Sequence, residues 1–295
     1  MEGVLMRSPN FWSMTVRNPE GELEVRAEPF RSVTRKNRFF RLPIVRGFLS
    51  LAETLWLGMK ALTTSTNIAL GEEEELSKKE IFFTMFVGLG LALVLFLAAP
   101  VLGTMGIDWL LGGIVTNALV FNIIEGALRI GVFIAYLVLI SAFSTDIKRF
   151  FAYHGAEHKA IKVYERGREL IPQNARGMNT MHVRCGTSFV LYVLVASIFI
   201  FSLLPLTGWF LMVLSRIIVI PLVAGLAFEF IIWSARNQDN SVVQVLVWPG
   251  LQLQKLTTRE PDDEMVEVAM TSLRKVLALE DEERTSPDGS EKLVI

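Results

Sequence analysis

Two histidines and a glutamate lie within one five-residue stretch, His154-x-x-Glu157-His158. The chain has only three histidines and one cysteine, and the other two of these residues, His182 and Cys185, are three positions apart. If the first stretch is helical, its two imidazoles lie one turn apart on the same face, with the glutamate beside them. That is the H-x-x-E-H type of site, in which histidines hold a zinc ion and the glutamate works on its bound water. The spacing therefore predicts a metal site formed by His154, His158, His182 and Cys185.

The ligand types favour zinc, although another divalent transition metal could use the same nitrogen and sulfur atoms. A closed shell of four protein ligands is structural, whereas hydrolysis needs three protein ligands and a water. Glu157 favours catalysis, because a general base must lie within hydrogen-bond reach of that water. In the catalytic case either His182 or Cys185 is the third ligand, and the sequence leaves this choice open. The alternative is that Glu157 only orients a ligand imidazole or pairs with a nearby lysine.

The composition places these residues in a membrane protein. The 295 residues are 52% hydrophobic and only 20% charged, and the apolar residues come in long runs, which is typical of membrane-spanning segments. The mean hydropathy is +0.43. A net charge of −1 argues against a nucleic-acid partner. A single cysteine excludes an internal disulfide and suits a reducing compartment. The N-terminus lacks the basic and apolar regions of a cleaved signal peptide.

The apolar runs predict a mainly α-helical, polytopic protein with about four transmembrane helices. Residues 81–103 are uncharged and long enough to cross a bilayer. Residues 109–143 are longer than one crossing needs, so we divide them near Gly126, with an interfacial or re-entrant helix that ends at about Glu125 and a second span that reaches about 143. Residues 187–207 and 209–234 are the third and fourth spans.

Four ionisable residues fall inside the apolar segments, and ionisable groups there often mark function. Glu125 and Arg129 have the spacing of a helical ion pair. Arg216 could reach the same depth from the other side. We expect a structural polar cluster rather than an ion or substrate path. Glu229 is near the end of the last span. The sequence allows it three roles: an interfacial carboxylate, a metal ligand, or a hydrogen-bond partner of a metal ligand.

The remaining segments are polar or amphipathic. Residues 13–17 and 22–26 alternate in polarity around an Asn-Pro-Glu-Gly turn, which predicts a β-hairpin.

Lysine and arginine are abundant before residue 47, across 144–185 and after Arg236, so the positive-inside rule places both termini and the metal site in the cytoplasm. The expected organisation in chain order is 1–42, a cytoplasmic β-element with a basic cluster that meets anionic lipid; 43–70, an amphipathic interfacial helix; 81–143, two spans with an interfacial or re-entrant helix; 144–186, the metal-site loop; 187–234, two spans; 242–280, interfacial and cytoplasmic helices; and 281–295, a disordered tail.

Four separated motifs in this order resemble the YqhQ-like bacterial membrane proteins (DUF1385), a family of unknown function often catalogued as predicted metal-dependent enzymes. The motifs are Met1-Glu-Gly-Val-Leu-Met-Arg7, Tyr153-His-Gly-Ala-Glu-His-Lys159, Arg184-Cys-Gly-Thr-Ser188 and Leu256-Thr-Thr-Arg-Glu-Pro261. The resemblance implies a bacterial inner-membrane protein whose signature polar positions are His154, Glu157, His158, His182 and Cys185. The family usually has glycines and a glutamine ahead of Glu2, which implies residues before Met1, and a proline where this chain has Val183.

The sequence therefore predicts a membrane-embedded, zinc-dependent hydrolase with its site at the cytoplasmic face. Its substrate would carry a peptide, ester or phosphoester bond, with Glu157 as the general base. The alternative is a non-enzymatic scaffold, channel or transporter-like protein with a structural metal. The lipid bilayer is the expected partner, and a homo-oligomer is compatible with this architecture.

Overall fold

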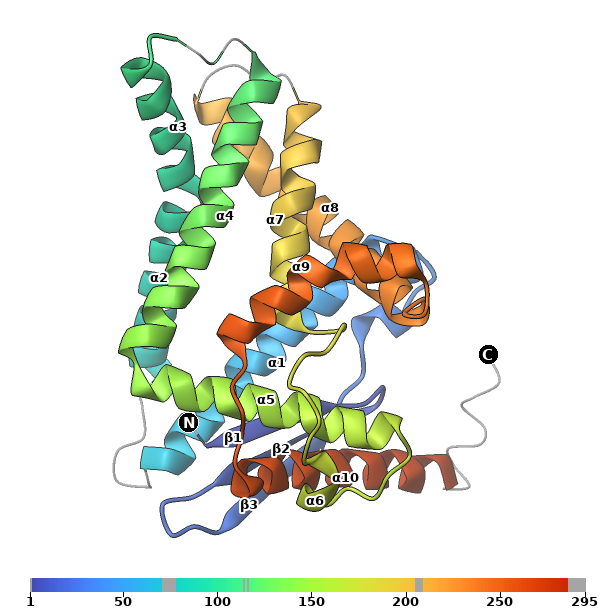
Figure 1. Ribbon diagram of the computed structural model, residues 1–295. Coiled ribbons are helices and arrows are strands. Elements are labelled where there is room, and N and C mark those ends of the chain that lie inside the picture. The colour runs from blue at the N-terminus through green and yellow to red at the C-terminus, as the bar shows by residue number, and fades with distance from the viewer. Residues whose placement is uncertain (1, 71–77, 114, 116, 205–208, 286–295) are drawn as a thin grey trace.

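The computed structural model describes residues 2–70, 78–113, 115, 117–204 and 209–285. Apolar helices form one end of the molecule, and a small antiparallel sheet packed between helices forms the other end (Figure 1). This arrangement confirms the predicted fold class, a mainly α-helical chain with a β-element near its N-terminus.

Among the described residues, three helices are long and apolar enough to cross a membrane, judged by length and composition, and they cover Phe82–Leu110, Ala118–Phe143 and Leu214–Arg236. The first consists of α2 (Lys78–Leu93), a π-helical turn (Val94–Ala98) and α3 (Ala99–Leu110). The others are α4 (Ala118–Phe143) and α8 (Trp209–Arg236). The predicted third span is α7 (Gly186–Ser202), whose 17 residues rise about 26 Å, a little less than a hydrocarbon core of about 30 Å.

The expected division of the second apolar segment near Gly126 is wrong, because α4 continues through this position as one helix. Its start is fixed by Asn117, whose side chain accepts a hydrogen bond from the Val120 amide at 3.0 Å. Gly126 serves packing instead. A Cβ there would lie 2.3 Å from the Ile198 side chain of α7, so the missing side chain allows α4 and α7 to approach closely. The Glu125 charge is neutralised inside the bundle, so the helix has no need to end there.

The other end of the molecule is built on a sheet of order β1-β2-β3, from β1 (Gly3–Arg7), β2 (Phe11–Arg17) and β3 (Leu23–Pro29). The predicted hairpin is β2 and β3, with Thr15 opposite Val25; β1 was not predicted. The central strand is buried on both faces. Trp12, Met14 and Val16 pack in one cluster with the α1 residues Leu57, Ala61 and Ile68, and Ser13 on the opposite face hydrogen-bonds Ser272 of α10 at 2.9 Å.

Helix α1 (Val45–Leu70) corresponds to the predicted amphipathic segment, and its side away from the sheet exposes Leu55 and Trp56. After α8, the chain forms α9 (Ser241–Thr257) and α10 (Asp263–Thr285). The last helix extends past the predicted start of a disordered tail at 281. Its later turns are held to the connection between β1 and β2, because Glu280 accepts hydrogen bonds from Ser8 Oγ at 2.6 Å and Asn10 Nδ2 at 2.8 Å. Residues 286–295 lie outside the described residues.

Candidate metal centre

The predicted helix around the H-x-x-E-H motif is α5 (Thr145–Glu165), which crosses between the apolar bundle and the sheet (Figure 1). Ser144 caps its first turn by accepting a hydrogen bond from the Ile147 amide at 3.2 Å. Within the motif, Gly155 permits a very close backbone approach, because a Cβ there would lie 2.1 Å from the Arg259 carbonyl oxygen. The Arg259 amide in turn donates to the Phe151 carbonyl at 2.9 Å. The backbone that follows α9 is therefore in direct contact with α5.

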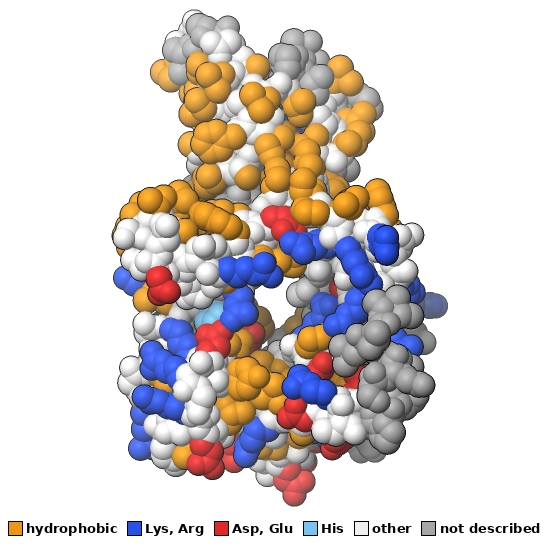
Figure 2. Space-filling model, turned by 90° about the vertical axis from the view of Figure 1, so that its right-hand side faces the viewer, with side chains coloured by type: hydrophobic (Ala, Val, Ile, Leu, Met, Phe, Trp, Pro, Cys, Tyr) orange, Lys and Arg blue, Asp and Glu red, His pale blue; other side chains and the backbone are white. Residues whose placement is uncertain are grey.

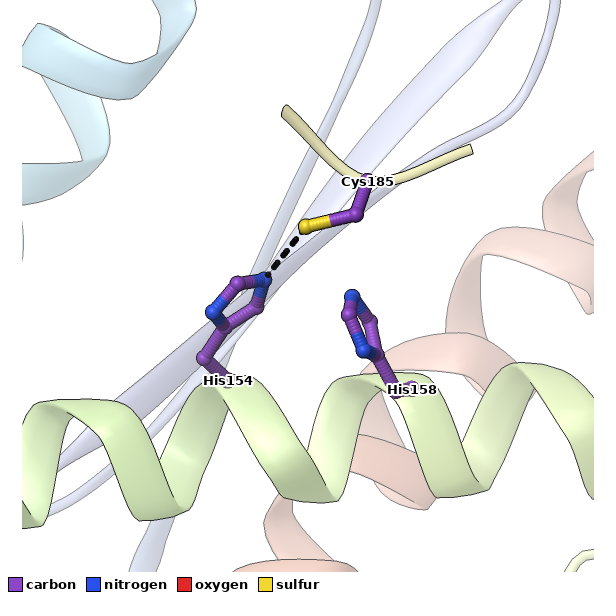
Figure 3. Close-up of side chains that lie close together, drawn as sticks. All are labelled: His154, His158 and Cys185. Atoms are coloured by element: carbon purple, nitrogen blue, oxygen red, sulfur yellow. Dashed lines mark hydrogen bonds between the residues drawn. The ribbon is translucent and has the colours of Figure 1, made fainter. Parts of the chain in front are cut away.

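Cys185 comes to the same place from the loop that precedes α7. It is the N-cap residue of that helix, and its sulfur accepts a hydrogen bond from the Thr187 amide at 3.4 Å. The His154 and His158 side chains rise from α5 towards this sulfur (Figure 3). His154 Nε2 is 3.3 Å from Cys185 Sγ, and one ligand atom from each of the three residues lies within 4.8 Å of the others.

Backbone carbonyls determine which ring nitrogens face the centre. His154 Nδ1 is 2.8 Å from the Thr257 carbonyl, and His158 Nδ1 bonds to the Thr180 carbonyl. A carbonyl only accepts, so each Nδ1 must carry a proton and each Nε2 is the atom left for the centre. Metal-binding histidines are oriented by this kind of bond to their other nitrogen. Zinc at about 2.0 Å from nitrogen and 2.3 Å from sulfur requires ligand atoms roughly 3.3–3.6 Å apart, so the three residues fit zinc after a small contraction.

His182, the predicted fourth ligand, does not join this group. Its ring centroid is 5.7 Å from that of His158, but both of its nitrogens are used elsewhere. Nε2 is 3.2 Å from Glu165 Oε2, and Nδ1 accepts from the Arg184 amide at 3.2 Å. Burial lowers the pKa of His182. The structure therefore brings together three of the four predicted ligands, with Cys185 rather than His182 as the third.

A buried glutamine that the sequence interpretation missed fixes this arrangement. Gln254 of α9 accepts from the His182 amide and donates to the His182 carbonyl, both at 2.8 Å. Its Nε2 also donates to Ser188 Oγ at 2.7 Å. The loop before Cys185 is therefore tied to α9 and α7 together. The only sign of this role in the sequence is that Gln254 is an amide side chain among apolar residues of an amphipathic segment.

Glu157 is half-buried beside the three residues. Burial raises the pKa of its carboxyl above the usual range, although the nearby His154 and His158 act in the opposite direction. Its carboxylate forms no hydrogen bond within the described part of the chain. A carboxylate with a raised pKa and no protein partner is suited to exchange a proton with a bound molecule.

Without a metal, the His154–Cys185 contact is an ion pair. Burial raises the pKa of the Cys185 thiol, but His154 and His158 outweigh it and lower the pKa to about 5. Burial lowers the pKa of His154, but Cys185 and Glu157 raise it to about 9. At pH values between these two pKa values, the Cys185 thiolate accepts a hydrogen bond from the protonated Nε2 of His154. Binding of a metal must displace that proton.

We expect alkylation of Cys185 in metal-free protein to follow a midpoint near pH 5, instead of the roughly 8.5 of an ordinary thiol. The thiolate is the nucleophile, and His154 stabilises it above that midpoint. Rates of iodoacetamide labelling, measured by mass spectrometry across pH, test this at the only cysteine of the chain. His154→Ala should move the midpoint upwards, whereas His182→Ala should leave it in place. An unchanged midpoint in His154→Ala would contradict the ion pair.

The charges inside the apolar bundle form a separate cluster. Glu125 pairs with Arg129 one turn along α4 and lies 3.5 Å from Arg216 of α8. Arg129 also donates to Ser197 Oγ of α7, and Arg216 donates to Asn122 Oδ1, both at 3.2 Å. All five side chains are buried. Each charged group meets several partners, as a structural cluster would require.

Glu229, the fourth predicted intramembrane residue, lies elsewhere. It accepts two hydrogen bonds from Arg46 of α1, at 2.7 and 2.6 Å. This pair ties α1 to α8 and involves neither the polar cluster nor the metal ligands. The sequence allowed Glu229 to be a metal ligand, a partner of a ligand or an interfacial carboxylate; the structure shows neither of the first two and instead gives an ion pair between helices.

These observations define a mainly α-helical protein whose apolar helices suit a lipid bilayer, with a cluster of histidines and a cysteine at the end nearer the sheet. Residues 42–279 match the family described as "Protein of unknown function (DUF1385)", and the chain belongs to this family. It is 31% identical over 291 residues to "Uncharacterized protein YqhQ" of Bacillus subtilis (strain 168), an alignment that covers 95% of this chain and 91% of that protein. No solved structure matches the chain.

Proposed function

We propose that the chain is a membrane-embedded, zinc-dependent hydrolase whose ligands are His154, His158 and Cys185 and whose general base is Glu157. The orientation of the two imidazoles is the observation that carries the proposal. Each Nδ1 bonds to a carbonyl of a different segment, which directs both Nε2 atoms to the cysteine sulfur. Structural core histidines have no need for this shared direction, whereas metal ligands do.

Three protein ligands, rather than four, favour catalysis over a purely structural role. When bound, zinc would lower the pKa of a water and polarise the bond to be cleaved. Glu157 would accept the proton of that water and later donate it to the leaving group. Burial raises the pKa of this carboxyl, which is the direction that suits a group that exchanges protons.

The distribution of lysine and arginine supports a location in the bacterial inner membrane with both termini in the cytoplasm. The site would then lie at the cytoplasmic membrane face. Substrates with a peptide, ester or phosphoester bond, presented at the interface or in the inner leaflet, suit this position.

The second candidate is a scaffold in which the same metal is structural. The observation that favours it is burial, because Cys185 and His158 are each only 3% exposed. A conduit is less well supported. The cavity beside Asn122 and Arg216 has a volume of about 20 Å³, which holds about one water molecule. The charged side chains there form ion pairs with one another, whereas a conduit would need them to line a water-filled path.

Metal analysis of the purified full-length protein tests the proposal. We expect about one zinc per chain in the wild type, its loss in His158→Ala and Cys185→Ser, and its retention in the matched control His182→Ala. Glu157→Gln should keep the metal and the unfolding temperature. Hydrolysis of chromogenic ester, phosphodiester and peptide substrates should fall roughly 10²–10⁴-fold in this variant.

Two results would contradict this proposal. Loss of metal in His182→Ala to the same degree as in His158→Ala would show that the ligand set is wrong. Metal binding with no hydrolysis of any substrate class by the wild type, and with a lower unfolding temperature in every ligand variant, would favour the scaffold.

A further inference from the structure

A hollow of about 490 Å³ opens between the segment that leads into α1 and the end of α8. Arg35, Arg41 and Arg46 line one side of it, and Phe228 and Ile232 of α8 line the other. One wall is therefore cationic and the other is apolar. None of these residues belongs to the metal centre or to the polar cluster of the bundle.

Part of the charge on the cationic wall has no counter-ion among the described residues. Arg46 is paired with Glu229. Arg35 donates to the side-chain amide oxygen of Asn10, and Arg41 donates to the Arg35 carbonyl at 3.2 Å. Both of these acceptors are uncharged. In the described part of the chain neither Arg35 nor Arg41 has a carboxylate at ion-pair distance, so two positive charges face the hollow without a counter-ion.

The hollow lies where hydrocarbon would meet water. Phe228 and Ile232 are one helical turn apart near the end of α8, a helix suited to span a membrane as far as Arg236. Phe39 and Leu42, on either side of Arg41, are 59% and 49% exposed. On the face drawn in Figure 2, lysine and arginine side chains gather directly beneath a belt of hydrophobic ones. Exposed apolar groups beside unpaired cations are typical of a membrane interface.

The shape of the hollow is built into the fold. Ile44 has a φ of 71°, a conformation that a β-branched residue adopts only when its surroundings impose it. Gly225 of α8 makes room for this turn, because a Cβ there would lie 2.5 Å from the Ile44 carbonyl oxygen. The bidentate Arg46–Glu229 pair fixes the adjacent turn of α1. The start of α1 is therefore held against α8 before any ligand binds, which fixes one wall of the hollow and favours affinity.

We propose that this hollow is a binding site for an anionic phospholipid. Arg35 and Arg41 contact the phosphate of the headgroup, and an acyl chain runs along Phe228 and Ile232. Arginine suits this role because its planar guanidinium matches phosphate oxygens. This site is independent of the metal centre and of the proposed hydrolase activity.

Native mass spectrometry of the delipidated full-length protein in detergent tests the site, with equal amounts of phosphatidylglycerol and phosphatidylcholine added. We expect the wild type to retain phosphatidylglycerol about tenfold over phosphatidylcholine. The double variant Arg35→Gln, Arg41→Gln should bring this ratio close to one. The matched control Lys36→Gln, Arg38→Gln removes the same charge from the same segment without touching the hollow, and it should keep most of the preference.

Equal loss in the two double variants would overturn the proposal, since it would indicate attraction by net charge rather than a site. Inorganic phosphate at 10 mM distinguishes a lipid from a free anion. It should leave the lipid bound, because phosphate lacks the acyl chain that contacts α8. Complete displacement by phosphate, or no preference in the wild type, would also overturn the proposal.

Discussion

Replacement of Gly155 by alanine should abolish the proposed metal binding while most of the fold survives. The added Cβ would lie 2.1 Å from the Arg259 carbonyl oxygen and 3.2 Å from the Thr180 side chain. The first of these is backbone, so α5 and the chain after α9 must separate. His154 is oriented by the Thr257 carbonyl at the end of α9, and His158 by the carbonyl of Thr180. The Thr180 side chain also meets the chain after α9, because its hydroxyl lies 2.9 Å from that of Thr258. Separation therefore removes the bonds that direct both Nε2 atoms to Cys185.

Zinc content of the purified variant, with the unfolding temperature measured in the same preparation, checks this expectation. We expect less than a tenth of the wild-type metal, because loss of a bond to a metal-binding imidazole typically lowers affinity 10–100-fold and both imidazoles are affected. The matched control is Gly131→Ala in α4, where nothing lies within 4 Å of the added Cβ. That change should be neutral or stabilise by about 0.5–1 kcal/mol. Normal zinc binding in Gly155→Ala would show that these carbonyls do not position the ligands.

Glu125→Gln should destabilise the protein by about 3–5 kcal/mol, because it leaves buried charges without their counter-ion. Glu125 is the shared partner of Arg129 and Arg216, and all three side chains are at most 4% exposed. In the described part of the chain Arg129 pairs with no other carboxylate. The variant keeps the size of the side chain, so the effect isolates the charge.

Unfolding free energies in detergent micelles give the measurement, and a second ion pair supplies the control. Glu229→Gln breaks the Arg46 pair, whose side chains are 22% and 37% exposed. Partly exposed pairs contribute about 0–1 kcal/mol, so this change should be mild. Combining Glu125→Gln with Arg129→Met and Arg216→Met should recover much of the loss, because no unpaired charge then remains. Equal effects of Glu125→Gln and Glu229→Gln would contradict the role of burial.

The sequence by itself determined the features that depend on periodicity and composition. Long apolar runs are unfavourable in water, so they specified the apolar helices α2 to α4, α7 and α8. The alternation and turn around residues 13–26 specified the hairpin of β2 and β3. A spacing of four residues places two side chains on one face of any helix, so His154 and His158 had to be neighbours once α5 formed. The family membership was also readable from separated motifs.

Tertiary structure decided which distant groups meet. Cys185 reaches the imidazoles because it caps α7 above α5, whereas His182 turns to Glu165 because Gln254 holds its backbone. The Thr257 and Thr180 contacts use carbonyls, which every residue carries, so no residue type could reveal them. Glu125 and Glu229 look alike in sequence, yet one meets two arginines of the bundle and the other meets Arg46 of α1. Helical period fixes neighbours within a helix, but only packing between helices fixes partners across the chain.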